Sequence, residues 1–288
     1  MKRLRVLGCL LVSVPVLAQN AGEMSRVPVA GGQLEYEVRG HGEPVLLIHG
    51  SIVAAAFRPL MPEPALQGYQ LIRYHRRGLA NSSAPAGPFR IEDQAADALA
   101  VLQHVGIEKA HIVGHSYGGV VALQLALDAP TVVKSLVLLE PAIPAGGGPP
   151  PENILRALSL YQNGDKAGAI DAISREAFGP EWRDLLSRTI PGAIEDAVDD
   201  ADTTFRIENP AIAQWRFGQQ EANRIQQPVV FMLGTLSGPR QAERLKVLQS
   251  WIPHLQSQVI EGANHSLWLQ QPTVVARAIA AFLAENPI

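Results

Sequence analysis

Residues 114–119 of this 288-residue chain have the sequence GHSYGG and stand between two apolar segments. Residues 111–113 before them have the pattern of a buried strand, and residues 120–127 after them have that of a helix. The glycines permit a tight, strained turn that lifts the Ser116 side chain above the sheet, while the Tyr117 N–H and the helix start favour a developing negative charge. The segment therefore predicts a strand–turn–helix unit with Ser116 as candidate nucleophile. A glycine-rich turn whose serine only caps the helix is the alternative.

The rest of the chain alternates strand-like and helix-like patterns. Residues 27–30 and 33–38 predict an antiparallel hairpin, and residues 91–105 predict an amphipathic helix. Six apolar runs are typical of strands covered on both faces: residues 45–48, 70–74, 110–113, 135–139, 228–233 and, more weakly, 257–260. This order predicts an α/β fold with a mostly parallel central sheet and helices on both of its faces.

One interval breaks this alternation. About 80 residues separate the strand that ends near Glu140 from the strand that starts near Pro228, which is too long for one crossover. The interval begins with a Pro/Gly-rich stretch and contains three helical patterns, at residues 154–161, 167–178 and 182–190. We therefore expect a helical cap at residues 144–225, inserted into an α/β core formed by residues 26–143 and 226–288.

The N-terminus has the pattern of a signal peptide. A basic start is followed by the apolar residues 6–18, which are too few to span a bilayer. We expect cleavage after Ala18, hence a periplasmic or secreted protein without stable membrane insertion; an N-terminal anchor or a buried helix is the alternative. Cys9, the one cysteine, lies in this segment, so the processed protein would hold no disulfide, no thiolate nucleophile and no cysteine metal site.

Charge is balanced along the chain. Its 24 Lys and Arg and 27 Asp and Glu residues give a formal net charge of −3 and are mixed throughout, so no basic stripe is available for phosphates. We therefore expect no nucleic-acid partner.

Four landmarks together resemble the α/β-hydrolase superfamily. They are the pair His49 and Gly50 after an apolar strand, the segment RGLANS at residues 77–82, the GHSYGG turn, and the segment GANH at residues 262–265. The resemblance runs from about Val27 to the C-terminus and is weakest in the insertion. It is specific for the fold and not for a substrate.

The resemblance implies a role for several residues. Ser116 is the expected nucleophile, and His265 is the expected general base that takes the proton from the serine. Tyr117 and Ser51 are expected to donate backbone N–H groups to the oxyanion, with Ile52 as the alternative to Ser51. Such a system needs neither a metal ion nor an organic cofactor, and no spacing of His, Asp or Glu in the sequence indicates a metal site.

The third member of the expected triad departs from the commonest pattern. The loop at residues 234–239, GTLSGP, contains no acid where relatives often carry aspartate. Glu140 ends the apolar strand after the nucleophile helix, a placement that resembles some lactonases and haloalkane dehalogenases of the superfamily. A buried glutamate there would be costly without a partner. We therefore expect Glu140 to be the acid, with Glu243 and Glu261 as competitors.

A serine nucleophile points to acyl chemistry, because dehalogenases and epoxide hydrolases of this fold attack through a carboxylate. The expected reaction is hydrolysis of a small ester or lactone; carbon–carbon bond hydrolysis, perhydrolase activity and a weakly catalytic ligand receptor are the alternatives. Aromatic residues of the insertion favour a compact hydrophobic or aromatic substrate. The candidate substrate contacts are Ile52, His115, Trp182, Trp215 and Trp268.

Overall fold

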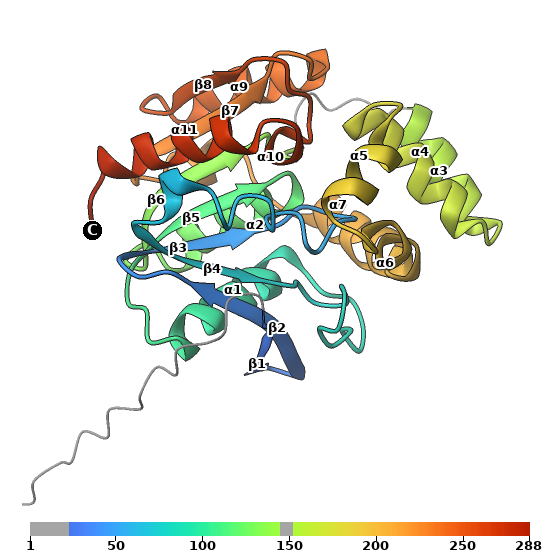
Figure 1. Ribbon diagram of the computed structural model, residues 1–288, viewed down its shortest axis with the longest axis horizontal. Helices are drawn as coiled ribbons and strands as arrows, with labels where there is room; N and C mark the ends of the chain where they lie inside the picture. The colour runs from blue at the N-terminus through green and yellow to red at the C-terminus, as the bar shows by residue number, and fades with distance from the viewer. Residues whose placement is uncertain (1–22, 145–151) are drawn as a thin grey trace, which may run out of the picture.

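Eight strands form one sheet in the computed structural model, which describes residues 23–144 and 152–288. Their order across the sheet is β1-β2-β4-β3-β5-β6-β7-β8 (Figure 1). β1 and β2 are antiparallel to their neighbours, whereas β3 to β8 are parallel. The strands are β1 (Ser25–Val29), β2 (Gly32–Arg39), β3 (Glu43–Ile48), β4 (Tyr69–Tyr74), β5 (Ala110–His115), β6 (Val133–Leu139), β7 (Val229–Gly234) and β8 (Gln256–Ile260). The expected mostly parallel sheet is confirmed; the expected signal peptide lies outside the described residues.

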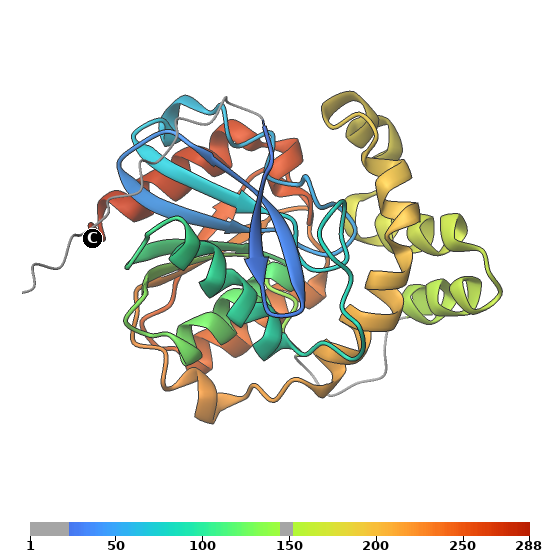
Figure 2. The same ribbon diagram turned by 90° about the horizontal axis from the view of Figure 1, so that it is seen from below.

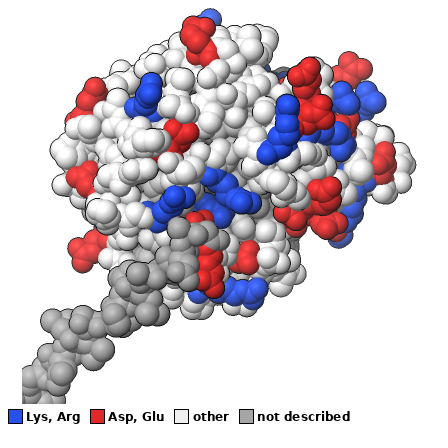
Figure 3. All heavy atoms as spheres, in the orientation of Figure 1, with Lys and Arg blue, Asp and Glu red and all other residues white. Residues whose placement is uncertain are grey.

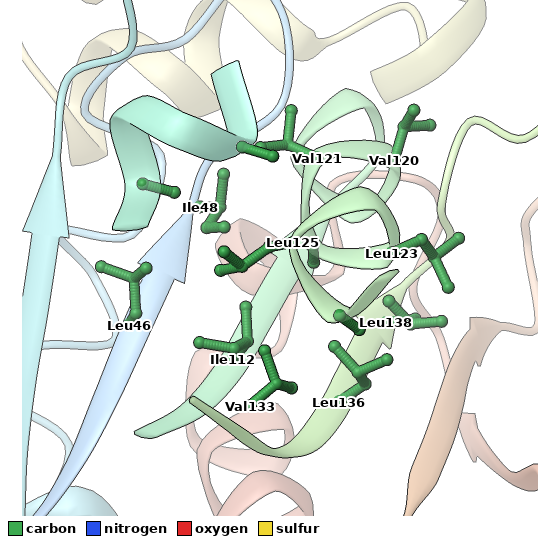
Figure 4. Close-up of a cluster of buried hydrophobic side chains, with 14 of the residues drawn as sticks. Leu46, Ile48, Ile112, Val120, Val121, Leu123, Leu125, Val133, Leu136 and Leu138 are labelled. Atoms are coloured by element: carbon green, nitrogen blue, oxygen red, sulfur yellow. The ribbon is translucent and has the colours of Figure 1, made fainter. Parts of the chain in front are cut away.

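Helices cover both faces of the sheet. One face packs against α1 (Ile91–His104), α2 (Tyr117–Asp128) and α9 (Pro239–Trp251), and Figure 4 shows its apolar cluster between α2 and the strands. The other face packs against the 3-10 turn η1 (Pro64–Leu66), α10 (Leu267–Gln270) and α11 (Pro272–Ala284). Ile112 and Val113 are consecutive in β5 and belong to opposite clusters, which is why the central strands are continuously apolar. None of the helices in the described ranges has the length and apolar character needed to cross a bilayer.

Between β6 and β7 the chain forms a group of helices, the helical insertion, which lies to one side of the sheet (Figures 1 and 2). It consists of α3 (Glu152–Gln162), α4 (Lys166–Phe178), α5 (Trp182–Thr189), α6 (Ala193–Asp199), the π-helix η2 (Thr203–Glu208) and α7 (Asn209–Gln214); the short α8 (Gln219–Ala222) then leads back to the sheet. The three helical patterns of the sequence correspond to α3, α4 and α5. The shorter α6, η2 and α7 carry no comparable pattern, and their conformation depends on packing.

Charged side chains gather on the outer surface of the insertion (Figure 3). Asp171 pairs with Arg175 at 2.7 Å and with Arg183 at 2.9 Å, and Lys166 pairs with Asp202 at 3.1 Å. Such exposed pairs contribute little to stability. The contacts that hold the insertion to the α/β core therefore lie on its inner side, the side that faces the loops after the parallel strands.

Polar contacts fasten the inner side of the insertion to loops that follow the parallel strands. The Thr203 hydroxyl donates to the carbonyl of Gly78, and the backbone N–H of Ala80 donates to the Asp200 carboxylate at 2.7 Å. At the other end of the sheet, the Asn264 amide donates to the carbonyl of Phe178 at 2.7 Å. The insertion thus contacts loops after both β4 and β8.

Asp200, which forms one of these contacts, makes the stability of the protein depend on pH. Burial raises the pKa of its carboxyl group to about 6, and the neighbouring carboxylates of Asp196 and Asp199 act in the same direction, against the hydrogen bond from Ala80. The pKa in the folded state therefore lies above the unfolded value of about 4. For an acid this means that the contribution of Asp200 to the free energy of unfolding is fully present below about pH 4 and is lost as the pH rises from about 4 to 6.

We therefore expect Asp200→Asn to stabilise the protein at pH 8 by about 1 kcal/mol, a figure reduced because solvent still reaches the carboxylate. The asparagine oxygen can still accept from Ala80, so the contact survives without the buried charge. Urea unfolding at pH 8 and at pH 4.5 measures the gain, which should shrink at the lower pH. Asp199→Asn, on the exposed neighbour, is the control. An equal gain from both variants, or one independent of pH, would contradict this assignment.

Candidate active site

Ser116 occupies the sharp turn between β5 and α2. Its φ of 51° and ψ of −116° are strained for a residue with a side chain, at a cost of about 1–3 kcal/mol. The surrounding structure holds this conformation: Ser116 N–H donates to the carbonyl of Leu139 at 2.9 Å, and the Ser116 carbonyl accepts from Ala142 N–H at 2.9 Å. A Cβ atom on Gly118 would lie 2.0 Å from the carbonyl oxygen of Ile48, so α2 can start here only with glycine at that position.

His265 follows β8 and lies beside the residue that precedes Ser116. The rings of His115 and His265 are 4.8 Å apart, and His115 Nε2–H donates to the backbone carbonyl of His265 at 2.8 Å. Burial, with a smaller contribution from His265, holds the pKa of His115 well below the usual histidine value. His115, expected as a substrate contact, is therefore a buried neutral support for the His265 loop.

Glu140 ends β6 and lies directly against His265. Its side chain is fully buried, and its Oε2 accepts from His265 Nδ1–H at 2.7 Å. Its Oε1 accepts from the backbone N–H of Gly234 at 2.8 Å and from the hydroxyl of Ser237. The loop without an acid thus supplies two donors to an acid carried by the neighbouring strand. This full set of partners compensates for burying the carboxylate.

The carboxylate also fixes the state of the imidazole. Because Nδ1 carries the proton donated to Glu140, the neutral His265 ring has an unprotonated Nε2, the form that can accept a proton. Gln241 Nε2 lies 3.1 Å from the same Nδ1, but an amide N–H can donate only to an unprotonated nitrogen. The shorter, charged contact with Glu140 decides the tautomer.

The two competing acids lie elsewhere. Glu243 in α9 and Glu261 after β8 are exposed, and among the described residues neither forms a hydrogen bond with His265. The geometry therefore brings Glu140 to the histidine and leaves Glu243 and Glu261 at the surface.

The two expected oxyanion donors lie on segments that pack tightly together. Within the described residues, the backbone N–H groups of Ser51 and Tyr117 have no protein acceptor. A Cβ atom on Gly50 would lie 2.8 Å from His115 Nδ1 and 3.1 Å from Ser116 Cβ, so the Ser51 loop touches the turn that carries Ser116. Tyr117 is the first residue of α2, where helix N–H groups lack intrahelical partners and attract negative charge. Two free donors therefore flank Ser116.

Of the other expected substrate contacts, Trp268, Ile52 and Trp182 differ from Trp215 in where they are buried. Trp268 is buried 5.9 Å from the His115 ring, and Ile52 is buried after the Ser51 loop with φ of 76°. Trp182 is buried in the insertion and donates to Asp171 at 3.2 Å. Trp215, by contrast, donates to Gln124 in α2 at 2.8 Å and packs with the cluster on that face of the sheet. The structure does not bring Trp215 to the site.

The structure brings to the site one of the aromatic residues expected to line the pocket from the insertion, and two polar residues that sequence reasoning did not expect there. Phe178, at the end of α4, stacks over His265 with ring centres 6.4 Å apart. Ser237 and Gln241 contact the Glu140 and His265 pair. These side chains are ordinary in the sequence, and only the packing of the loops after β6, β7 and β8 brings them together.

Other features of the described residues do not add to this site. No group of three or more His, Cys, Asp and Glu side chains in residues 23–144 and 152–288 is arranged to hold a metal ion. A polar cleft of about 630 Å³ is lined by Glu35, Arg73 and Asp200, among others, but not by Ser116 or His265. Its buried charges pair with one another, as in the 2.6 Å contact between Arg73 and Glu37.

Comparisons with known proteins identify the fold family. A family model described as "alpha/beta hydrolase fold" matches residues 43–272. A protein of Azorhizobium caulinodans named "Putative carbamate hydrolase RutD" is 37% identical over 116 residues, which cover 39% of this chain and 44% of that protein. A 2-hydroxymuconate semialdehyde hydrolase of Pseudomonas putida is 25% identical over 286 residues, covering 93% and 96% of the two chains. The chain spans 44%, 41% and 58% of three such carbamate hydrolases.

Solved structures share the same architecture. The enol-lactonase of Burkholderia xenovorans superposes with a TM-score of 0.77 at 21% sequence identity, over 90% of this chain and 100% of that one. At this identity the likeness concerns the fold.

Proposed function

Because this chain belongs to the α/β hydrolase fold family, we propose that it is a hydrolase that cleaves a carboxylic ester or lactone through an acyl-enzyme on Ser116. The observation that carries the proposal is the 2.7 Å contact between Glu140 and His265 Nδ1, beside a serine on a strained turn. This contact leaves His265 Nε2 free to accept the serine proton.

In the proposed reaction, His265 Nε2 takes the proton of Ser116 Oγ as the oxygen attacks the carbonyl carbon. The carbonyl electron pair moves onto the carbonyl oxygen, and this oxyanion accepts hydrogen bonds from the backbone N–H groups of Ser51 and Tyr117. The tetrahedral intermediate collapses, and His265 returns the proton to the departing alkoxide. Water, deprotonated by the same nitrogen, then hydrolyses the acyl-enzyme and frees Ser116. Glu140 stabilises the imidazolium in both halves of the reaction.

For the substrate, we propose a compact hydrophobic or aromatic acyl or alcohol group, with the helical insertion acting as a cap. Phe178 stacks over His265 from the insertion, and Trp268 lies edge-on to the His115 ring. The hydrogen bond from Asn264 to the Phe178 carbonyl holds this part of the insertion at the His265 loop. Aromatic surface beside the base favours an apolar group over a charged one.

Hydrolysis of a carbon–carbon bond is the second candidate. The relative named 2-hydroxymuconate semialdehyde hydrolase matches almost the full length of the chain, and the same Ser, His and carboxylate groups could serve that reaction. The partial matches to carbamate hydrolases make carbamates a further substrate class to include in the test.

A fluorophosphonate probe and a substrate panel test the proposal. We expect rapid labelling of Ser116, and turnover of p-nitrophenyl and phenyl esters or γ-lactones that exceeds turnover of p-nitrophenyl carbamates and vinylogous 1,5-diketones. Ser116→Ala is the control for background hydrolysis. Faster turnover of the diketones than of the esters and lactones would favour carbon–carbon bond cleavage over ester cleavage as the function. Absent labelling and absent turnover would favour a ligand receptor.

A further inference from the structure

Arg76, in the loop after β4, is a fully buried cation that touches the backbone before Ser51. Its Nε donates to the carbonyl of His49 at 3.0 Å, and its Nη2 donates to the carbonyl of Gly50 at 2.9 Å. The carbonyl of Gly50 and the N–H of Ser51 belong to one planar peptide group and point in opposite directions. A donor that holds this carbonyl therefore fixes the direction of the Ser51 N–H.

His49 completes this arrangement. Its Nδ1–H donates to the same Gly50 carbonyl at 2.7 Å, and its Nε2 accepts the backbone N–H of Arg76 at 3.0 Å. Burial, followed by the positive charge of Arg76, holds the pKa of His49 well below its usual value, so the ring is neutral and its tautomer is fixed. Two donors thus polarise the Gly50–Ser51 peptide and strengthen its N–H as a hydrogen-bond donor.

The same guanidinium also contacts the second expected donor. Arg76 Cζ lies 4.6 Å from the centre of the Tyr117 ring. Arg76 Nη1 donates to Gln94 Oε1 at 2.7 Å, and Gln94 Nε2 donates to the Tyr117 hydroxyl at 2.6 Å. One side chain therefore supports both segments that flank Ser116, although it lies on neither.

The counter-ion of Arg76 comes from the helical insertion. Glu208, the last residue of η2, accepts from Arg76 Nη2 at 2.5 Å, and both side chains are 1% exposed. Without Glu208 the guanidinium would be a buried, unpaired cation, which is strongly unfavourable. Docking of the insertion is thus part of what holds Arg76 in place.

We infer that Arg76 is the positioning residue of the oxyanion hole and that Glu208 couples this position to the docked insertion. The inference rests on the proposed function, because it concerns how Ser51 and Tyr117 are held for an oxyanion. It assigns a catalytic consequence to an ion pair whose members are 132 residues apart.

Arg76→Lys tests the positioning role, because lysine keeps the charge and loses the planar fork. Arg77→Lys is a matched control: Arg77 is also buried and pairs with Asp97 at 2.8 and 2.9 Å, but none of its hydrogen bonds reaches the Ser51 or Tyr117 segments. We expect Arg76→Lys to lower kcat by about 10- to 100-fold with KM changed less than about threefold, since the donors act mainly on the transition state. Arg77→Lys should leave kcat within about threefold.

A second readout separates positioning from general loss of structure. A trifluoromethyl ketone forms a hemiketal oxyanion on serine, whereas the corresponding methyl ketone binds mainly as a neutral carbonyl. The ratio of their inhibition constants therefore measures oxyanion stabilisation. We expect this ratio to fall in Arg76→Lys by about the same factor as kcat, and to stay unchanged in Arg77→Lys.

Glu208→Gln tests the coupling, with Asp97→Asn as its matched control, and both variants keep side-chain volume. We expect Glu208→Gln to lower the ketone ratio about five- to tenfold, while Asp97→Asn leaves it unchanged. The double variant Arg76→Lys/Glu208→Gln should be no worse than Arg76→Lys alone, because coupled residues are not additive. Should Arg76→Lys fail to fold in a thermal melt, the Glu208→Gln and Asp97→Asn pair still decides the question.

The possible outcomes are distinct. Wild-type activity and an unchanged ketone ratio in Arg76→Lys would overturn the positioning role while leaving the proposed function intact. Equal effects of Glu208→Gln and Asp97→Asn, or multiplicative effects in the double variant, would overturn the coupling. A wild-type protein that neither reacts with the fluorophosphonate nor turns over the panel would remove the proposed function and this inference with it.

Discussion

Ser116→Ala is expected to lower kcat/KM for every substrate of the wild-type protein by about 10⁴- to 10⁶-fold. The change removes the oxygen that would form the acyl-enzyme, and the remaining rate would come from binding and the oxyanion donors alone. The fold should survive, because Ser116 is only half-buried and its backbone bonds to Leu139 and Ala142 do not involve the side chain. Steady-state kinetics on the best ester of the panel, with circular dichroism as a folding check, measures both expectations.

Alanine also makes the variant useful for binding studies. Substrate affinity, measured by calorimetry or by competition, should change little, since the hydroxyl contributes to the transition state more than to the ground state. Retention of most of the activity in Ser116→Ala would refute Ser116 as the nucleophile.

Glu140→Gln is expected to lower kcat by about 10²- to 10⁴-fold; neutralising the acid of a serine-protease triad costs about 10⁴-fold. The glutamine oxygen can still accept from Gly234 and Ser237, so the side chain should keep its place. Its amide group then faces His265 Nδ1 as a donor and favours the tautomer with a proton on Nε2. That tautomer cannot accept the proton of Ser116.

Glu243→Gln and Glu261→Gln are the controls for this prediction. Both residues are exposed, and the substitutions should change kcat by less than about twofold. Kinetics of the three variants, with folding confirmed for each, decides the assignment. Near wild-type activity of Glu140→Gln together with a collapse of either control would move the acid to another residue, while the fold and the Ser116 and His265 assignments would stand.

The sequence alone was sufficient for the architecture of the α/β core, because its signals are local. Consecutive residues such as Ile112 and Val113 face opposite sides of a sheet covered by helices, so a continuous apolar run already indicates a buried parallel strand. The turn that carries Ser116 is equally local, since its signal is the GHSYGG segment between a strand pattern and a helix pattern. Where a segment is short, as in α6, η2 and α7, no local pattern was strong enough to predict it.

Only those residues of the site that directly follow predicted strands could be predicted from the sequence. Ser116, Glu140 and His265 each follow an apolar run, and the carboxyl ends of parallel strands meet at one edge of the sheet. The sequence left Glu243 and Glu261 as competing acids, and only the folded chain separates them from Glu140 by exposure and hydrogen bonding. Trp215 was expected at the substrate, yet it packs against α2, because an aromatic residue in a sequence carries no information about which face it covers.

What the sequence determined by itself was therefore the core of the fold, the strand–turn–helix unit at Ser116 and the placement of His265 after the last strand. The tertiary structure alone decided which acid meets His265, that Ser237 and Gly234 hold that acid, and that Arg76 pairs with Glu208. The physical reason is range. Strand, turn and helix preferences act between near neighbours in the chain. The free energy of a buried charge depends instead on its partner, which for Arg76 lies 132 residues away and is known only once the chain has packed.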